Sequence, residues 1–363
     1  EERFSRNGEI VYFRIYDRKR YYRARFAEEG LMAELAERTD EHWTQKREEV
    51  SSSRPIVFLV WLVSHLPLWF VGLLAFPISF FYFACSKRAR NESRAYQNRL
   101  LQYTEGRDDR IKRPHIYRHI VSFALCIIEK IEGWCGKIDF NKINLHDDDI
   151  TLLIEELDRK KGALLIGSHL GNIEMLRSLA EYGRTGVSHY VPVTAILNLN
   201  TTKKFNNTIK EINPHVQLNI INADEIDAGT ISLLMDRIDE GGLVVIAADR
   251  TSLNTVDRAI TENFLGKPAR FSYGAFLLAA LLKAPTYFVF ALREKTLMLT
   301  PRYSMHVHKT GIAFDCPRAE REARIKRLCG EYVALLEKYC TMYPLQWYNF
   351  FNFWVEDENL KEA

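Results

Sequence analysis

The sequence predicts an α/β protein in which a mostly parallel sheet is covered by helices and is preceded by a membrane-anchoring helical segment. Two observations indicate this. From residue 161 onward, short apolar runs alternate with longer helical patterns, which is typical of strands joined by crossover helices. Before that region, residues 55–86 include no Asp, Glu, Lys or Arg. We expect three parts: residues 1–41, an anchor with its flanks at 42–90, and the domain 91–363.

The composition is that of an ordinary folded protein. The chain is 47% hydrophobic and 27% charged, which excludes a disordered or low-complexity protein. The 50 Lys and Arg nearly balance the 47 Asp and Glu, so charge gives no indication of a nucleic-acid binder. The six cysteines form no CxxC pair, which argues against a zinc cage and fits a reducing compartment.

Residues 1–41 form an extension of unknown role. The segments 9–16 and 21–26 have the pattern of short strands, and 28–38 has a helical pattern. No function follows from these elements.

The uncharged run at 55–86 is long enough to cross a bilayer, which takes about 20 apolar residues. Pro67 and Pro77 interrupt it, so a tilted span, a broken helix and a re-entrant hairpin all remain open. The alternative is a pair of buried core helices. Aromatic residues and basic flanks favour a membrane anchor. We expect residues 55–75 to act as a tether and 77–85 to pack against the domain.

The rest of the chain is predicted to alternate helices and strands. Residues 91–135 are expected to be helical, with an apolar face that includes Ile120, Ile128 and Ile131. The predicted strands are 163–167, 187–193, 216–221, 243–248, 285–292 and an edge strand at 297–307. The predicted helices are 173–182, 201–212, 230–238, 273–283 and 321–340.

Chemistry is expected where the parallel strands end, because sites of open α/β sheets lie outside the carboxyl ends of strands. The strand 163–167 runs into Ser-His-Leu-Gly-Asn-Ile-Glu, which places His169 in the turn and Glu174 at the start of the next helix. Gly171 opens the turn, so the carboxylate of Glu174 can fold back onto the imidazole. A carboxylate on one ring nitrogen makes the other a better general base. The alternative is a structural turn histidine.

A second strand end carries Asp249 and Arg250, which should face the same crevice. Arginine can clamp a phosphate or carboxylate with two hydrogen bonds, and Asp249 can orient a neighbouring group. The alternative is a solvated pair that caps a strand. The basic segment 264–271, which includes Arg270, is expected to be a loop that covers an anionic headgroup or a phosphopantetheine arm, or a plain surface loop.

Several enzyme classes lack their motifs in this sequence. It has no G-x-S-x-G elbow, no P-loop lysine and no G-x-G-x-x-G, which counts against α/β-hydrolases, nucleotide hydrolases and Rossmann dehydrogenases. His306 and His308 alternate on a predicted strand with no further ligand at metal spacing. We therefore interpret them as a surface pair and predict no metal site.

The motif Ser-His-Leu-Gly-Asn-Ile-Glu resembles the H-x4-[DE] motif of the glycerophospholipid acyltransferase superfamily, and the chain most resembles the bacterial lipid A biosynthesis (lauroyl/myristoyl) acyltransferases. The segments VIAADRT, FLGKPARFSYGAFLLAALLKAP and PLQWYNFFNFW support this resemblance over about residues 41–354. The last two are similar to a branch associated with aryl-polyene clusters. A glycerol-3-phosphate acyltransferase-like fold is implied.

The resemblance implies roles for particular residues. His169 would be the catalytic base and Glu174 its partner, while Asp249 and Arg250 match a later charged motif. Between these motifs the family usually has a basic or polar one, and here the segment LNLNTTKKFNN offers Lys204 but no arginine. The expected substrate-binding residues are Asp249, Arg250, Asn172, Lys204 and Arg270.

The resemblance also implies a reaction and a location. An acyl group would pass from acyl carrier protein, or from coenzyme A, to a hydroxyl of a membrane glycolipid, without a metal or cofactor. The enzyme would lie in the bacterial inner membrane, with its site facing the cytoplasm. The alternatives are a lysophospholipid or phosphatidyl-mannoside-type acyltransferase that uses acyl-coenzyme A, and a non-catalytic lipid-binding scaffold.

Overall fold

The computed structural model describes most of the chain after residue 53. The described residues are 54–105, 112–134, 140–145, 148–180, 187–198, 219–251 and 258–354. They belong to one compact unit that extends from Lys46 to Ala363. The elements expected in residues 1–41 and the helix expected at 201–212 lie outside the described residues. The division between 42–90 and 91–363 stays a prediction.

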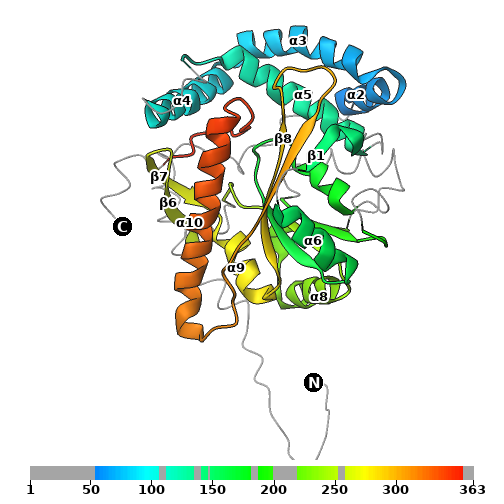
Figure 1. Cartoon of the computed structure of the whole chain (residues 1–363). Helices are drawn as coiled ribbons and strands as arrows, with labels where there is room; N and C mark the ends of the chain where they lie inside the picture. The colour runs from blue at the N-terminus through cyan, green and yellow to red at the C-terminus, as the bar shows by residue number, and fades with distance from the viewer. Residues whose placement is uncertain are drawn as a thin grey trace, which may run out of the picture. The chain divides into compact units, whose positions relative to one another are not determined.

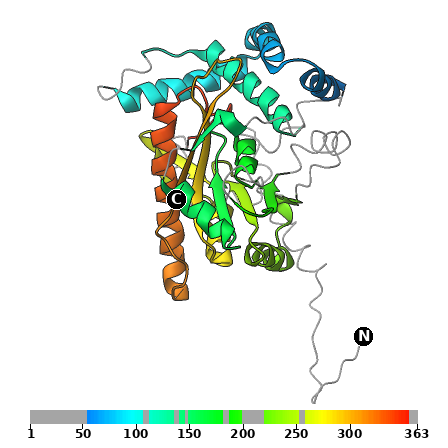
Figure 2. The same cartoon turned by 45° about the vertical axis from the view of Figure 1, so that its right-hand side comes forward.

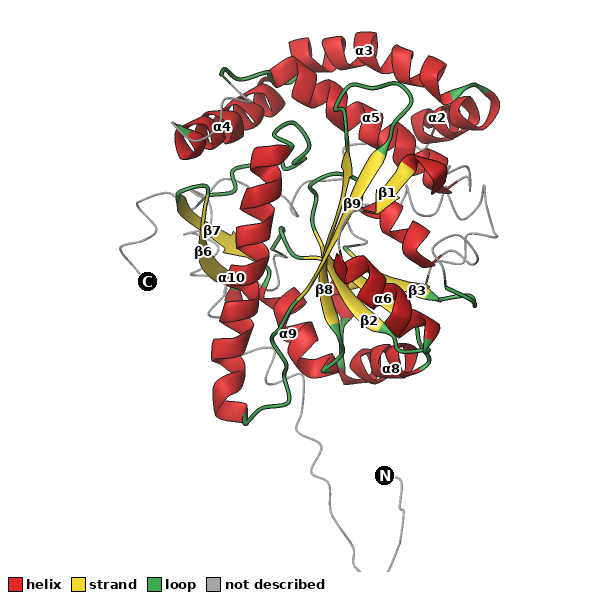
Figure 3. Ribbon diagram, in the orientation of Figure 1, coloured by secondary structure: helices red, strands yellow, loops and turns green. Residues whose placement is uncertain are grey.

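The described helices and strands alternate through the second half of the unit (Figures 1 and 3). The helices are α2 (Arg54–His65), α3 (Leu68–Cys85), α4 (Lys87–Thr104), α5 (Ile116–Trp134), α6 (Asp148–Asp158), α8 (Ala228–Asp239), α9 (Tyr273–Leu282), α10 (Arg318–Met342) and the 3₁₀ segments η3 (Phe140–Lys142), η4 (Ile173–Ala180) and η5 (Ala223–Glu225). The strands are β1 (Ile143–Leu145), β2 (Ala163–Gly167), β3 (Val193–Leu197), β4 (Asn219–Asn222), β5 (Leu243–Ala247), β6 (Ile260–Phe264), β7 (Lys267–Phe271), β8 (Thr286–Arg293) and β9 (Tyr303–Lys309).

The main sheet has seven strands in the order β1-β9-β8-β2-β5-β3-β4. All neighbouring pairs are parallel except β8 and β9, which form an antiparallel pair. The predicted fold class, a mostly parallel sheet covered by helices, is therefore confirmed. β9 is not the edge strand that the sequence predicted, because β1 pairs along its outer side.

The central strands are buried on both faces, which explains why they read as continuous apolar runs. On β2, Leu164 and Ile166 join one core cluster, and Ala163 and Leu165 join the other. Residues of α8, α9 and α10 belong to the first cluster, and residues of α6 and η4 belong to the second. Because side chains alternate along a strand, two such layers hold the sheet in place from either side.

Several predicted boundaries need correction. The strand predicted at 187–193 begins only at Val193, and the helix predicted from Ile173 is a 3₁₀ segment. The strand predicted at 297–307 begins at Tyr303. Residues 294–302 form the loop between β8 and β9, and its apolar Leu297 and Leu299 pack with α2, α3 and α5 instead of extending the sheet.

The basic segment 264–271 is a hairpin and not the expected loop. β6 and β7 pair antiparallel, from Ile260 opposite Phe271 to Phe264 opposite Lys267. Leu265 and Gly266 between them have φ of 50° and 78°, the left-handed pair that a two-residue hairpin turn requires. The hairpin sets Arg270 on β7, where it is exposed.

The uncharged segment is a broken helix. α2 ends at His65, and α3 begins after Pro67, while Pro77 lies inside α3 without ending it. α3 is the one helix of the described residues that is long and apolar enough to cross a membrane, judged by length and composition. Only 22% of its apolar window is buried.

Both halves of this segment pack in part against α5 and leave other apolar side chains exposed. Val60 and Val63 of α2, with Val71 and Ala75 of α3, are buried in a cluster with α5. Ile78 and Phe81, in the half expected to pack against the domain, are 64% and 68% exposed. Phe80 and Phe83 contact the ring of Tyr117 on α5, so some of the packing expected at 77–85 is present. The first half also leaves large apolar side chains exposed, among them Phe58 and Trp69.

The helices α3, α4 and α5 lie across one end of the main sheet (Figures 1 and 2). It is the end at which β8 passes into the loop that leads to β9. β2 and β5 run in the same direction as β8, so their carboxyl ends point to this layer. The turns that follow β2 and β5 thus lie between the sheet and the helical layer.

Candidate active site

The pairing of β2 with β5 brings His169 next to Asp249. These strands are parallel neighbours, with Gly167 opposite Ala247, and the amide of Ala248 donates to the carbonyl oxygen of Gly167 over 3.0 Å. His169 and Asp249 each lie two residues beyond this last pair. Their juxtaposition therefore follows from the register of two buried strands.

The turn after β2, residues 168–172, is fixed by its backbone. Gly171 has a φ of 77°, and a Cβ on it would lie 2.1 Å from the carbonyl oxygen of Ala291 on β8. The amide of Gly171 donates to the carbonyl of Gln346, and the amide of Asn172 donates to that of Ala291. Only glycine fits this position, because a side chain would meet both the left-handed conformation and the neighbouring strand.

The carboxylate of Asp249 holds His169 at two points. Its Oδ1 lies 2.7 Å from Nδ1 of the imidazole, and its Oδ2 accepts from the backbone amide of His169 over 2.9 Å. Asp249 is fully buried, whereas the side chain of His169 is 32% exposed. A carboxylate that accepts at Nδ1 selects the tautomer with the proton on that nitrogen, so Nε2 is left to accept a proton.

Both groups have pKa values below their ordinary range. Burial raises the pKa of Asp249, but the charge and the hydrogen bonds of His169 and the charge of Arg250 lower it further than burial raises it. Burial and the charge of Arg250 lower the pKa of His169, and Asp249 opposes them only in part. At neutral pH the pair is therefore a neutral imidazole next to an ionised carboxylate, which is the state that a general base needs.

The C-terminal segment after α10 completes the surroundings of Asp249. Oδ2 also accepts from the indole Nε1 of Trp347 over 3.1 Å and from the side-chain amide of Asn349 over 3.0 Å. The amide of Tyr348 donates to the carbonyl of His169 over 3.0 Å. Trp347 and Asn349 are site residues that the sequence does not predict. The aromatic character of PLQWYNFFNFW was visible, but no spacing linked it to Asp249.

Arg250 is held by the same segment. Its Nε donates to the side-chain oxygen of Asn349 over 2.7 Å, and Nη2 donates to the carbonyl of Tyr348 over 3.0 Å. The guanidinium also lies over the ring of Phe351. These contacts place a cation beside His169, whose pKa it lowers. The predicted role of Arg250 in binding substrate stays a prediction.

Glu174 and Asn172 lie on the other side of the turn. The carboxylate of Glu174 is 3.5 Å from Nζ of Lys130 on α5, and its amide donates to the side-chain oxygen of Asn172. Asn172 is 1% exposed and its side-chain amide lies 3.5 Å from the hydroxyl of Tyr303. Asn172 thus starts η4 and ties it to β9. The carboxylate that lies at Nδ1 of His169 is that of Asp249. The predicted pairing of His169 with Glu174 stays a prediction. Substrate binding by Asn172 also stays a prediction.

One further candidate lies apart from these contacts. Arg270 is exposed on β7, and its predicted role in binding substrate stays a prediction. Lys204 lies outside the described residues.

His306 and His308 are not the surface pair that the sequence predicted. His306 is 9% exposed, and its ring centre lies 4.6 Å from that of Tyr339 on α10. The Nε2 of His308 is 2.6 Å from the hydroxyl of Tyr339. Both histidines therefore lie under α10, which the alternation of a strand could not show. Among the described residues, no group of three or more potential metal-ligating side chains comes together.

The sheet and the residues at its carboxyl end have the arrangement of an α/β enzyme, with a histidine and a buried aspartate outside two neighbouring parallel strands. The comparison with protein families defines the class further. Residues 45–355 match the model of the bacterial lipid A biosynthesis acyltransferases, and the chain belongs to that family. The protein is therefore an acyltransferase that acts on lipids. A comparison with curated proteins found no match.

Proposed function

We propose that this acyltransferase moves a fatty acyl group from a thioester of acyl carrier protein, or of coenzyme A, to a hydroxyl of a membrane glycolipid, with His169 as the general base. The observation that carries the proposal is the 2.7 Å contact between Nδ1 of His169 and Asp249. It fixes the ring and leaves Nε2 as the nitrogen that takes a proton. The partly exposed imidazole is open to a substrate that approaches the end of the sheet.

The proposed transfer is direct. Nε2 of His169 takes the proton of the acceptor hydroxyl while the oxygen attacks the thioester carbonyl. The resulting imidazolium is stabilised by the ionised Asp249. The tetrahedral intermediate then collapses, the carbon–sulfur bond breaks, and the leaving thiolate takes the proton back from Nε2. The products are an ester and a free thiol, and the scheme needs no metal or cofactor.

Two charged features near the turn, Arg250 and the ion pair of Glu174 with Lys130, support this chemistry. The oxyanion of the intermediate requires a donor, and we assign that role to Arg250 or to backbone amides of the turns. The Glu174–Lys130 ion pair is the second feature, because Lys130 also lowers the pKa of His169 and Glu174 offsets its charge. Glu174 thereby supports the base whether or not it contacts the imidazole directly.

The proposed location is the bacterial inner membrane, with the site on the cytoplasmic side. α3 has the length and composition of a membrane span, and large apolar side chains remain exposed on it. An enzyme whose acceptor and product are lipids meets them at a higher effective concentration when it stays at the bilayer. Carrier-protein thioesters are cytoplasmic, which sets the orientation that we propose.

The variant His169→Ala tests the base. We expect a loss of transfer of about 10² to 10⁴-fold, which is the contribution typical of a general base. The variant should still fold and extract with membranes, and wild-type activity in it would refute the assignment. In the wild type, activity should fall on acidification only below the ordinary histidine value of 6.5, because the pKa of His169 is lowered. Mass spectrometry of lipids from a deletion strain would then identify the acceptor by its missing acyl chain.

A further inference from the structure

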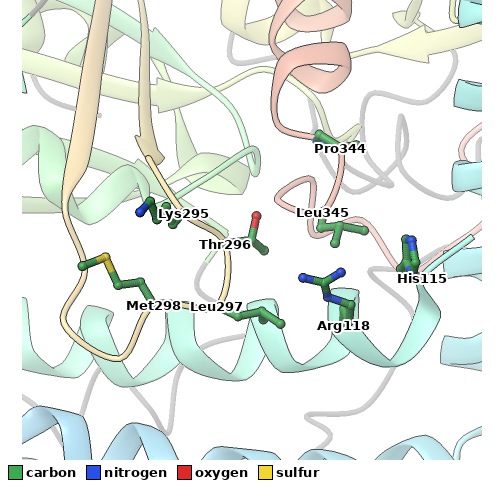
Figure 4. A pocket seen from close by; sticks show the side chains of 8 residues that line it. All are labelled: His115, Arg118, Lys295, Thr296, Leu297, Met298, Pro344 and Leu345. Atoms are coloured by element: carbon green, nitrogen blue, oxygen red, sulfur yellow. The ribbon is translucent and has the colours of Figure 1, made fainter. Parts of the chain in front are cut away.

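A cavity of about 530 Å³ opens between the helical layer and the C-terminal turn (Figure 4). It lies among the N-terminal end of α5, the loop that joins β8 to β9, and the turn after α10. The residues that line it are His115, Arg118, Lys295, Thr296, Leu297, Met298, Pro344 and Leu345. The lining therefore combines basic groups with apolar side chains and includes no carboxylate.

The basic side chains make this cavity a site for an anion. Arg118 and Lys295 are both exposed, and in the part of the chain that the structure describes no carboxylate forms an ion pair with either. Burial and the charges of Arg118 and Arg113 lower the pKa of His115, which shows how positive the surroundings are. The cavity also lies at the N-terminal end of the long helix α5, where the helix dipole adds to the attraction of an anion.

The loop that forms one wall is held in place by a buried arginine. Arg293 at the end of β8 is 1% exposed, and its guanidinium donates to the carbonyl oxygens of Thr296 and Met298. The same guanidinium forms a buried ion pair with Glu129 of α5, with 3.0 Å between Nη2 and Oε1. These bonds tie the loop to α5, so the backbone at Lys295 is held close to the helix that carries Arg118.

The apolar side of the cavity continues to α3. Leu297, which lines the cavity, belongs with Leu299 to the cluster formed by α2, α3 and α5. A Cβ on Gly72 of α3 would lie 3.2 Å from the side chain of Leu299. A ligand bound at Arg118 can therefore extend an apolar part along the helix that we place in the membrane.

We propose that this cavity binds the phosphate group of a membrane lipid. Arg118 offers a planar fork that suits two phosphate oxygens, and Lys295 supplies a second charge. A free phosphate would use the same cations but would gain nothing from Leu297 and its apolar neighbours. The inference depends on the membrane placement of α3 proposed above, and it concerns binding, so its test does not depend on catalysis.

The test is a calorimetric titration of the full chain in a neutral detergent with dioctanoyl phosphatidic acid. We expect saturable binding in the wild type and an affinity at least about tenfold lower when Arg118→Gln and Lys295→Gln are combined, because two charged contacts are lost. The matched control combines Lys326→Gln with Arg327→Gln, which removes the same charge from exposed positions of α10. It should bind as the wild type does. Both pairs lie on the surface, and melting curves will verify that the variants fold.

Other outcomes would overturn the proposal. Equal affinity in the wild type and the Arg118/Lys295 variant would show that the cavity is not the site. An equal loss in the control would show attraction by overall charge alone. Inorganic phosphate that binds as tightly as phosphatidic acid would indicate a free-anion site, and coenzyme A that binds more tightly would indicate a donor site. His169→Ala should bind phosphatidic acid as the wild type does. A failure of the proposed catalytic role would therefore appear in the transfer assay and not in this titration.

Discussion

Asp249 and Phe81 lie at opposite extremes of exposure, and each is the reverse of what its side chain would lead one to expect. Asp249 carries a charge and is fully buried, whereas Phe81 is a large aromatic residue and is 68% exposed. A buried charge is tolerated only when it is paired and hydrogen-bonded, and Asp249 accepts from His169, Trp347 and Asn349. An exposed aromatic patch on a folded protein marks a surface that binds another apolar partner, such as a protein or a membrane.

The comparison separates two tasks of the molecule, which are positioning the catalytic pair and attachment to lipid. At the turn after β2 the protein supplies every partner of the carboxylate, so the reacting group is positioned before substrate binds. On α3 the protein leaves apolar side chains uncovered, and we assign their cover to lipid. Changes at the turn should therefore affect the chemical step without membrane attachment, and changes on the exposed face of α3 should do the opposite.

The sharpest test of this division is Asp249→Asn. The amide no longer selects the Nδ1–H tautomer and no longer offsets the charge of the imidazolium, so we expect kcat to fall by about 10² to 10⁴-fold. Partition into bilayers should not change. Glu174→Gln is the matched control, because it removes a carboxylate on the other side of the turn. A larger loss in Glu174→Gln than in Asp249→Asn would make Glu174 the residue that orients the base.

The second test concerns the rigidity of the turn. In Gly171→Ala the new Cβ would lie 2.1 Å from the carbonyl of Ala291, so β8 or the turn must move. We expect a destabilisation on the order of 3 kcal/mol and a loss of most activity, measured by thermal unfolding and by transfer assays. Gly311→Ala is the control, since nothing lies within 4 Å of its Cβ position. An unchanged melting temperature in Gly171→Ala would contradict the tight turn.

The third test addresses the exposed face of α3. Ile78→Ser combined with Phe81→Ser removes two large apolar side chains that touch little of the protein, and each is worth about 1.5–3 kcal/mol when buried in an apolar phase. We expect vesicle binding to weaken by at least about tenfold, measured by flotation, while transfer to a detergent-dispersed acceptor persists. The control is Leu233→Ser on α8, where an apolar residue is also exposed. Equal vesicle binding by the wild type, the Ile78/Phe81 variant and the Leu233 variant would contradict the proposal that α3 contacts the membrane.

The smallest effect is expected from Trp347→Phe. The substitution keeps an aromatic ring but removes one of the N–H donors of Asp249, so kcat should fall by about threefold to tenfold. With one donor fewer, the carboxylate stabilises the imidazolium more strongly and raises the pKa of His169, so activity should be lost at a higher pH on acidification than in the wild type. Trp354→Phe is the control, because its indole donates to the carbonyl of Phe264 and not to Asp249. The same acid shift in both variants would show a general loss of packing.

The sequence was sufficient for the elements whose signal is local. β2, β5 and α9 are continuous apolar runs, and the structure has them within one residue of the predicted bounds. The shared crevice of His169 and Asp249 also followed from strand ends in a parallel sheet. The contact itself depends on which strands are neighbours and in which register, and no local pattern carries that information.

The errors have the same physical origin. The sequence divides residues 55–86 into a tether and a packed part, but each part has both buried and exposed apolar residues, because only the position of α5 decides which side chains are covered. Leu297 and Leu299 were read as strand residues, although they pack against a helical layer. Nothing in the sequence links the C-terminal aromatic segment to Asp249, because Trp347 and Asn349 lie 98 and 100 residues away and no sequence motif spans that distance.

The binding of Asp249 by Trp347 and Asn349 also sets the order in which the protein can become active during its synthesis. A ribosome has made β2 and β5 well before it reaches the residues that hold the carboxylate, which come 98 and 100 positions later. Until Trp347 and Asn349 have been synthesised, the carboxylate lacks two of its four donors, and the pair of His169 and Asp249 is not yet held in its active arrangement.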